Sequence, residues 1–319
     1  MSPRPVGHGR GGSTEAIGFR RARSSMQRDQ NDLKGKITMP LTHRVRPSGR
    51  ALFAAAVLSI VALLVPLWAG GLAGANPTQV AGLRPTIVLV HGDWADGSSW
   101  TAVMERLQRR GFTVVAPPNP LRGPATDAPY IASFLDTIPG PIVLVAHSYG
   151  GFVITNAATG NPNVKALVYI DAFVPDAGQS LLDLQVDTCI DPNFALDFVP
   201  SAGGVVDTYL RNEANGPYEG FSECFANGVN RNQAALLQAT QRPAALAQFF
   251  QPSGPPAWAS IPSWSLIGTA DRVITPANQQ AMSSNAGAQI STVDAGHLSL
   301  ITRPNAVAKV IETAVDATT

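Results

Sequence analysis

A serine stands at the apex of a predicted strand, tight turn and helix. The apolar run 141–146 ends in the letters HSYGG around Ser148, and a helical pattern follows over 152–158. This order predicts a nucleophile elbow, in which the turn strains the backbone of Ser148 and lifts its hydroxyl clear of the sheet. The helix behind it aims N–H groups and its positive dipole end at the same point. The alternative is an ordinary glycine-rich turn in which Ser148 caps the helix.

A serine hydroxyl needs a base, and the base needs a carboxylate that orients it. His297 follows the last predicted strand, at the same edge of the sheet as Ser148, and is the expected base. Asp271 follows the fifth predicted strand and is the expected acid, with Asp171 at the end of the fourth strand as second candidate. Asp271 could instead form an Asx turn or a helix cap, and His297 could be a surface-loop histidine. His147 is expected to point off the opposite side of the turn.

An oxyanion produced at Ser148 needs two N–H donors. The first predicted strand ends in the letters HGDW, where Gly92 lets the backbone turn toward the site. We therefore expect the backbone N–H groups of Asp93 and Tyr149 to form an oxyanion hole. His91 is interpreted as a structural brace of this loop. The Asp93 side chain must turn away from the oxyanion, and a cap of the helix beginning at Ser99 is one possible role for it.

Short apolar runs alternate with helical segments after residue 76, which is typical of a parallel α/β sheet. Helical patterns are expected over Ser99–Arg110, Phe152–Thr159 and Pro304–Ala314. The predicted strands are Thr86–Val90, Thr113–Ala116, Ile142–Ala146, Ala166–Ile170, Ser263–Ile267 and Gln289–Val293.

The segment 175–262 interrupts this alternation with mixed polar and aromatic residues. It is interpreted as a mostly helical cap over the edge of the sheet where ligands bind, or alternatively as a packing layer without ligand contact. Trp94, Phe173 and Phe221 are the expected lining of a substrate pocket. Cys189 and Cys224 both fall in the cap and are predicted to form a disulfide in an exported protein, the alternative being two free thiols.

The N-terminal part indicates export. Residues 1–50 form a basic leader, and an uncharged apolar run with small residues follows over 51–75. This is typical of a signal peptide cleaved after Ala75, so that the protein is secreted. The alternative is an uncleaved segment that anchors the protein in a membrane. Met39 would give a conventional start, with residues 1–38 as an upstream extension without function.

Bulk composition excludes several classes of protein. The 319 residues are 45% apolar and 14% charged, with a formal net charge of +1. A nearly neutral chain argues against nucleic-acid binding, because no basic face is implied. Two cysteines without a closely spaced Cys/His set argue against a structural zinc site. No metal or other cofactor is expected, and the expected partner is a small ester.

The motifs together resemble the α/β-hydrolase superfamily. They are His-Gly-x-Trp after the first strand, the Ala-His-Ser-Tyr-Gly-Gly elbow, Gly-Thr-Ala-Asp-Arg-Val-Ile and Ala-Gly-His. The small core is similar to the branch of plant methyl-ester esterases and hydroxynitrile lyases, and to exported actinobacterial members. The resemblance covers residues 85–319 and implies Ser148 as nucleophile, His297 as base and Asp271 as acid. It implies an α/β-hydrolase fold: about six mostly parallel strands, helices on both faces and a helical cap after the fourth strand.

The expected function is a secreted serine hydrolase that cleaves small apolar carboxylic esters through an acyl-enzyme. The core would comprise residues 76–174 and 263–319, and the cap residues 175–262. Alternatives on the same scaffold are a hydroxynitrile lyase-like or cofactor-free haloperoxidase-like enzyme, or a non-catalytic protein that binds small molecules. The related lyases use a cap lysine, and residues 175–262 contain no Lys, which disfavours that alternative.

Overall fold

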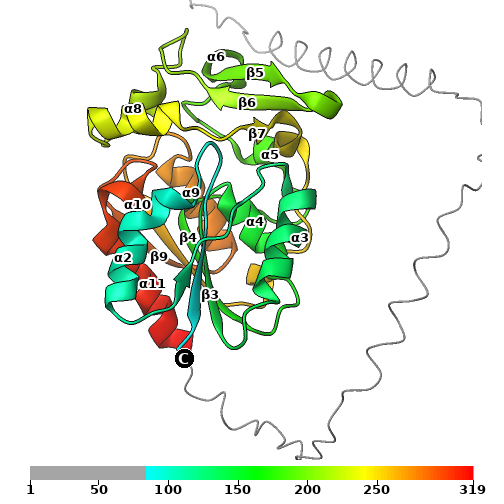
Figure 1. Cartoon of the computed structure of the whole chain (residues 1–319), viewed down its shortest axis with the longest axis vertical. Helices are drawn as coiled ribbons and strands as arrows, with labels where there is room; N and C mark the ends of the chain where they lie inside the picture. The colour runs from blue at the N-terminus through cyan, green and yellow to red at the C-terminus, as the bar shows by residue number, and fades with distance from the viewer. Residues whose placement is uncertain (1–83, 319) are drawn as a thin grey trace, which may run out of the picture. The chain divides into compact units, whose positions relative to one another are not determined.

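A six-stranded parallel sheet forms the centre of the protein in a computed structural model that describes residues 84–318 (Figure 1). The strand order is β2-β1-β3-β4-β8-β9, and every neighbouring pair is parallel. The strands are β1 (Thr86–Val90), β2 (Val114–Val115), β3 (Ile142–Ser148), β4 (Val164–Ala172), β8 (Ser263–Gly268) and β9 (Gln289–Val293). All six strands predicted from the sequence are therefore confirmed, with ends that differ by a few residues.

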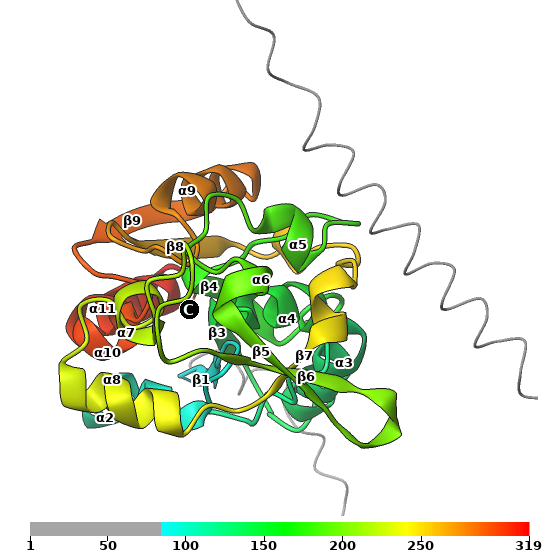
Figure 2. The same cartoon turned by 90° about the horizontal axis from the view of Figure 1, so that it is seen from above.

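Helices cover both faces of this sheet. Helices α2 and α11 pack on each other on one face, and α3 and α4 pack together on the other, as seen from above in Figure 2. Strand β3 is buried at every position, as its continuous apolar run predicts. The core helices are η3 (Gly97–Trp100), α2 (Thr101–Arg109), α3 (Pro124–Leu135), α4 (Gly150–Ala157), α9 (Pro276–Asn285), α10 (Ser299–Thr302) and α11 (Pro304–Thr318). The sequence predicted α2, α4 and α11 and missed α3 and α9.

The segment between β4 and β8 covers the carboxyl ends of the strands (Figure 1). Helices and helical turns predominate in it, as predicted. It also contains a three-stranded antiparallel sheet of order β5-β6-β7, which the sequence analysis missed. Its elements are α5 (Leu181–Leu184), α6 (Pro192–Ala195), β5 (Leu196–Pro200), η4 (Ala202–Gly204), β6 (Val206–Leu210), α7 (Phe221–Cys224), α8 (Arg231–Ala239), β7 (Ala244–Ala245), η5 (Leu246–Phe250) and η6 (Ala257–Ala259).

A disulfide joins Cys189 to Cys224 within this cap, with 5.8 Å between the two Cα atoms. This is the pairing that the sequence predicts. The basic leader 1–50, the apolar run 51–75 and the proposed cleavage site after Ala75 lie outside the described residues. Within residues 84–318, no helix combines the length and apolar character that a membrane span needs.

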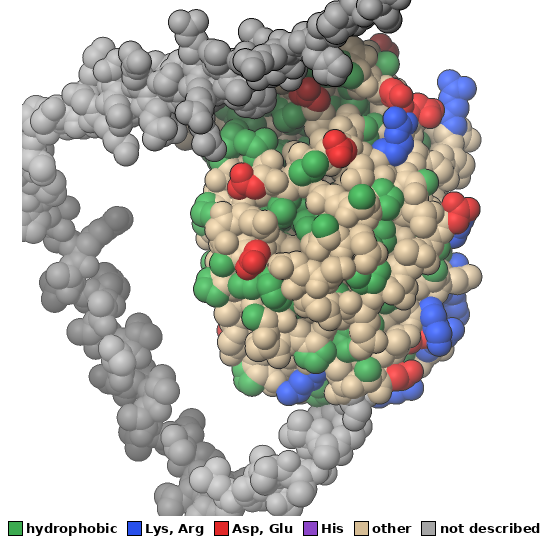
Figure 3. Space-filling model, turned by 180° about the vertical axis from the view of Figure 1, so that it is seen from behind, with side chains coloured by type: hydrophobic (Ala, Val, Ile, Leu, Met, Phe, Trp, Pro, Cys, Tyr) green, Lys and Arg blue, Asp and Glu red, His purple; other side chains and the backbone are tan. Residues whose placement is uncertain are grey.

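The surface away from the viewer of Figure 1 is largely uncharged. In the space-filling view of Figure 3, the Lys and Arg side chains of the described residues lie mainly toward the edges, near Asp and Glu side chains. A continuous basic surface, which binding to a nucleic-acid backbone requires, is not seen on this face of the described part.

Two glycines let the turn after β3 pack tightly. A Cβ atom on Gly150 would lie 2.6 Å from the carbonyl oxygen of Val90, and one on Gly151 would lie 2.0 Å from that of Phe173. Both neighbours are backbone atoms, which have no rotamer by which to move away. The start of α4 therefore lies directly against the ends of β1 and β4, as the pair of glycines in the elbow motif requires.

We predict that Gly151→Ala destabilises the protein more than Gly178→Ala. The first change forces a methyl group into a backbone oxygen, whereas Gly178 has open space around it and a left-handed φ of +83°. The second change should therefore cost only the strain of that conformation, about 1–2 kcal/mol. Thermal unfolding followed by circular dichroism measures the difference. Equal melting temperatures for the two variants would contradict the tight packing of the elbow.

Candidate active site

Ser148 lies at a strained turn. Its φ is +54°, a left-handed value that a residue other than glycine seldom adopts. The N-cap position of α4 belongs to Tyr149, and no side chain caps the helix there. The interpretation of Ser148 as an ordinary helix cap therefore does not hold, and its hydroxyl is left for another partner. Strain of this kind is frequent at functional sites.

That partner is His297. The Oγ atom of Ser148 lies 3.0 Å from Nε2 of His297, and Nδ1 of the same ring lies 2.9 Å from Oδ2 of Asp271. Asp271 accepts the Nδ1–H, which fixes the tautomer and leaves Nε2 free to accept the serine hydroxyl. The side chains of His297 and Asp271 are fully buried. The structure thus brings together the three residues that the sequence singled out, from the ends of β3, β8 and β9.

Asp271 also organises its own loop. Its Oδ1 accepts hydrogen bonds from the backbone N–H groups of Val273 and Ile274, and Oδ2 accepts one from the Gln279 side chain. Asp271 therefore forms the Asx turn through Oδ1 and the hydrogen bond to His297 through Oδ2, so the two arrangements that the sequence left open occur together. Burial raises the pKa of Asp271, and these hydrogen bonds act in the opposite direction. Gln279 is a contact that the sequence analysis missed.

Asp171, the second candidate for the acid, bonds elsewhere. Its two carboxyl oxygens accept from the backbone N–H groups of Gly268 and Ser299, at 2.7 and 3.2 Å. Its side chain therefore ties the end of β8 to the start of α10, next to His297. Burial and the nearby Asp271 raise the pKa of Asp171 well above its usual value. Asp271, and not Asp171, is the carboxyl that orients the histidine.

The other two described histidines have structural contacts. His91 Nε2 accepts the backbone N–H of Asn119, and its Nδ1 donates to the carbonyl oxygen of Gly92, so His91 braces the loop as expected. His147 Nε2 lies 2.8 Å from the backbone carbonyl oxygen of His297, to which it donates. His147 is therefore not the partner of Ser148, but it contacts the backbone of the residue that is.

The loop after β1 passes directly beside Ser148. A Cβ atom on Gly92 would lie 2.6 Å from Cβ and 3.2 Å from Oγ of the serine. This close approach brings the chain at Gly92 beside the hydroxyl of Ser148, and the oxyanion-donor role of the next N–H, that of Asp93, stays a prediction. Tyr149, the other expected donor, directly follows Ser148 and is the N-cap residue of α4. Its phenol donates to Asp127 at 2.7 Å, so only its backbone is left to face the serine.

The Asp93 side chain does not cap the following helix. Asp96 caps η3 by accepting the N–H of Ser98, whereas Asp93 Oδ2 accepts a hydrogen bond from the Gln248 side chain of the cap at 2.7 Å. Burial raises the pKa of Asp93 to about 8. This raised pKa favours the uncharged form of the carboxyl, which would repel a nearby oxyanion less than a carboxylate would.

Aromatic side chains cover the site. Ser148 is only 5% exposed, and the ring of Phe225 lies 5.3 Å from that of His297. Trp94 packs edge-on against Phe225 and beside Phe249. Sequence reasoning placed Phe225 and Phe249 in the cap but missed their position over the site, because helical spacing in short irregular segments does not show which way a ring points.

A small cavity adjoins these rings between the cap and the core. Trp94 and Phe221, two of the three expected pocket residues, line this cavity, whereas Phe173, Ser148 and His297 are not among its lining residues. The Phe173 backbone instead supports the elbow by donating to the carbonyl oxygen of Ser148. The lining residues are Trp94, Ala95, Asp96, Ser98, Ser99, Phe221, Phe225, Leu237, Thr240, Leu298 and Ile301.

Comparison with known proteins identifies the class to which this fold and site belong. The profile of the alpha/beta hydrolase family matches residues 87–310, which is most of the chain. The chain belongs to this family.

Two curated relatives are named as esterases. The chain is 34% identical over 125 residues to the carbendazim hydrolyzing esterase of Nocardioides sp., an alignment that covers 35% of this chain and 51% of that protein. The chain thus spans about half the length of this relative. It is 23% identical over 254 residues to the pimeloyl-[acyl-carrier protein] methyl ester esterase of Stenotrophomonas maltophilia, covering 73% and 94% of the two chains.

Solved structures share the fold at low identity. A methylesterase from Arabidopsis superposes with a TM-score of 0.59 at 17% identity, covering 73% of this chain and 99% of that chain. A pyrethroid hydrolase from Sphingobium faniae gives 0.56 at 20% identity, with 73% and 98% covered. An extracellular alpha/beta-hydrolase from a Paenibacillus species gives 0.57 at 21% identity, with 72% and 98% covered.

We predict that all three histidines of the described part stay neutral at pH 6.5. Burial lowers the pKa of His91 to about 4 and that of His297 to about 3, and it also lowers the pKa of His147. A free imidazole is half protonated near pH 6.5. Nitrogen NMR of a protein beginning at Asn76, whose sole histidines are these three, reports each ring. An imidazolium signal of half intensity at pH 6.5 from any of them would contradict the prediction.

Proposed function

We propose that this protein is a serine hydrolase that cleaves small apolar carboxylic esters through an acyl-enzyme. One observation carries the proposal: two hydrogen bonds in series, of 3.0 and 2.9 Å, link Ser148 to His297 and His297 to Asp271. A protein that only binds its ligand needs no such series. A neutral imidazole oriented toward a strained serine is useful when the serine gives up its proton during a reaction.

In the first half of the proposed reaction, Ser148 Oγ attacks the ester carbonyl carbon while its proton moves to His297 Nε2. The carbonyl oxygen becomes an oxyanion, which accepts hydrogen bonds from the backbone N–H groups of Asp93 and Tyr149. Asp271 stabilises the imidazolium through Nδ1. The tetrahedral intermediate collapses when the C–O bond to the leaving group breaks, and His297 gives its proton to the departing alkoxide. An alcohol and an acyl-serine result.

Water completes the cycle. It attacks the acyl carbon while His297 takes one of its protons, and the second tetrahedral intermediate again uses the same two N–H donors. Collapse breaks the bond to Ser148 Oγ, which recovers its proton from His297, and a carboxylic acid leaves. His297 thus acts as base and acid in alternation, which requires that it be neutral at the start of each half. Its lowered pKa supports this state at neutral pH.

The surroundings of Ser148 support an apolar substrate. The rings of Trp94, Phe221 and Phe225 line the cavity beside the site, and the relatives named above include esterases and a pyrethroid hydrolase. Aromatic walls of this kind gain their binding energy from buried apolar area and not from charge. Because Ser148 is almost fully covered, we infer that the side chains over it must shift before a substrate can reach it.

We predict that Ser148→Ala lowers the turnover of short p-nitrophenyl esters by at least about 10³-fold and abolishes labelling by a fluorophosphonate. The change removes the nucleophile while adding no bulk, so the fold should persist by circular dichroism. Ser265→Ala is the matched control, because Ser265 is equally buried but bonds only to Ser283. Labelling that survives in Ser148→Ala would refute the assignment of the nucleophile.

We also propose that the protein is secreted after cleavage behind Ala75. The basic residues before the apolar run, and small residues at Ala73 and Ala75, support this. The disulfide is compatible with export, because such bonds persist in oxidising compartments.

We predict that expression of the full chain in a secreting bacterial host releases into the culture medium a protein that begins at Asn76. N-terminal sequencing of that protein is the measurement. Ala75→Asp should block cleavage, because the cleaving enzyme requires a small residue there. Recovery of the unaltered chain from the membrane fraction, with its apolar run intact, would instead indicate an anchor.

A further inference from the structure

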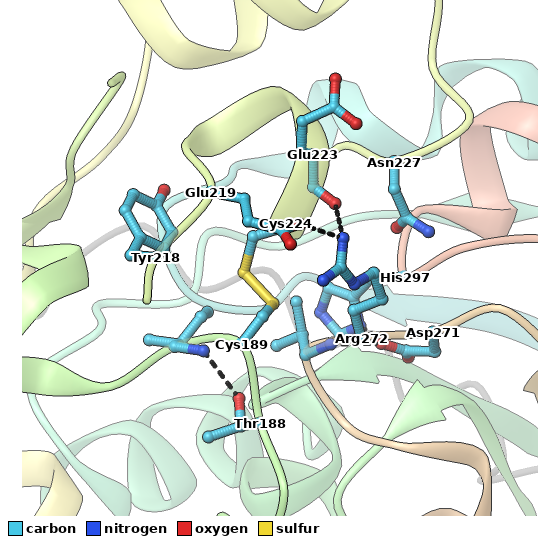
Figure 4. Close-up of a disulfide and its surroundings, with 12 residues drawn as sticks. Thr188, Cys189, Tyr218, Glu219, Glu223, Cys224, Asn227, Asp271, Arg272 and His297 are labelled. Carbon is cyan, nitrogen blue, oxygen red and sulfur yellow. Dashed lines mark hydrogen bonds and ion pairs between the residues drawn. A yellow bond between two sulfur atoms is a disulfide. The ribbon is translucent and has the colours of Figure 1, made fainter. Parts of the chain in front are cut away.

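The loop that carries Asp271 is held by the cap from two sides. We call residues 268–274 the acid loop. Within the core, Ala270 donates its N–H to the carbonyl oxygen of Ala295, which ties the acid loop to the residues just before His297. Outside this tie, the acid loop contacts two cap segments that are far apart in the sequence, one at Cys189 and one around residues 219–227 (Figure 4).

The first cap contact is on the C-terminal side of Asp271. The backbone N–H of Cys189 donates to the carbonyl oxygen of Arg272 at 2.9 Å. The guanidinium of Arg272 in turn donates to the Glu219 carboxylate and to the carbonyl oxygen of Glu223, next to Cys224. Arg272 therefore joins both cysteine-bearing segments, and it is the residue that directly follows Asp271.

The second cap contact is on the N-terminal side of Asp271. The Asn227 side chain donates its Nδ2–H to the carbonyl oxygen of Ala270 at 2.8 Å. The same side chain presses on the loop that carries His297, because a Cβ atom on Gly296 would lie 2.2 Å from Asn227 Oδ1. Asn227 thus touches the residue before Asp271 and the residue before His297.

The disulfide connects these contacts. The Cys189–Cys224 bond links the segment at Cys189, which contacts Arg272, to helix α7, which ends at Cys224. The chain then leads from α7 to Asn227, which contacts Ala270. We propose that Asn227 is a positioning residue that sets the distance between Asp271 and His297, and that the Cys189–Cys224 disulfide holds it in place. The proposal rests on the proposed function, for which that distance matters.

The consequence for turnover follows from geometry. The hydrogen bond from His297 Nδ1 to Asp271 exists only while the two loops keep their register, and Asn227 is wedged where they meet. Misplacing a reacting group by about 1 Å can cost on the order of 100-fold in rate. Asn227 is not among the residues that line the cavity, so its loss should affect kcat and leave KM nearly unchanged.

The test compares Asn227→Asp with Asn230→Ala. The first change keeps the shape but turns a donor into an oxygen that repels the Ala270 carbonyl. The second removes the side chain that caps α8 and touches neither loop. We expect Asn227→Asp to lower kcat about 10-fold or more with KM within about threefold, and Asn230→Ala to leave both unchanged. An Asn227→Asp protein that is folded and keeps its full kcat overturns the proposal.

A second measurement does not depend on turnover. The proton between His297 Nδ1 and Asp271 should give a downfield NMR signal in the unaltered protein and in Asn230→Ala. It should be lost or shifted upfield in Asn227→Asp and in the double variant Cys189→Ala/Cys224→Ala. An unchanged signal in both overturns the proposal. If the unaltered protein hydrolyses no ester, the proposed function fails while this signal still decides the positioning role.

Discussion

The two hydrogen bonds from Ser148 through His297 to Asp271 run through a region from which water is excluded, and this constraint governs much of the structure around them. A buried polar atom without a partner costs about 1–3 kcal/mol, so each remaining atom of the series must be satisfied by protein. The backbone of Val273 and Ile274 and the side chain of Gln279 serve Asp271. The loops at this edge of the sheet therefore keep one mutual arrangement.

The cap takes part in this arrangement at two places. On the side of Asp93 and Tyr149, Gln248 bonds to Asp93, and Asp207 pairs with Arg122. The backbone N–H of Arg122 donates to the Asp127 carboxylate, which accepts a hydrogen bond from the Tyr149 phenol. On the acid side, Asn227 and the residues beside the disulfide hold the loop of Asp271. A cap bonded to both halves of the site does more than cover it, because its hydrogen bonds help to hold the loops in place.

The elements of the fold could be predicted from the sequence where an apolar or helical pattern runs without interruption. The apolar runs predicted the central strands β1, β3 and β4, because burial on both faces leaves few polar positions in them. The edge strand β9 is instead largely polar and little buried, and its prediction depended on the alternation of strands with helices. Helix α3 escaped prediction because Pro129 lies inside it, which argues against a helix when read locally. The cap sheet was missed because β5 ends at Pro200 and a glycine turn separates it from β6. Pairing across that turn, not propensity, makes these residues strands.

The sequence by itself determined where a strained serine would lie, which histidine shares its edge of the sheet, and which two cysteines would meet. These predictions follow from the succession of strands along the chain and from the types of residue at the strand ends and in the cap. Only the tertiary structure decided that Asp271 and not Asp171 bonds to His297, and that Asp96 and not Asp93 caps η3. It alone placed Asn227 between two loops. Such choices depend on hydrogen bonds between segments distant in sequence, whose partners differ by a few ångströms that no local spacing encodes.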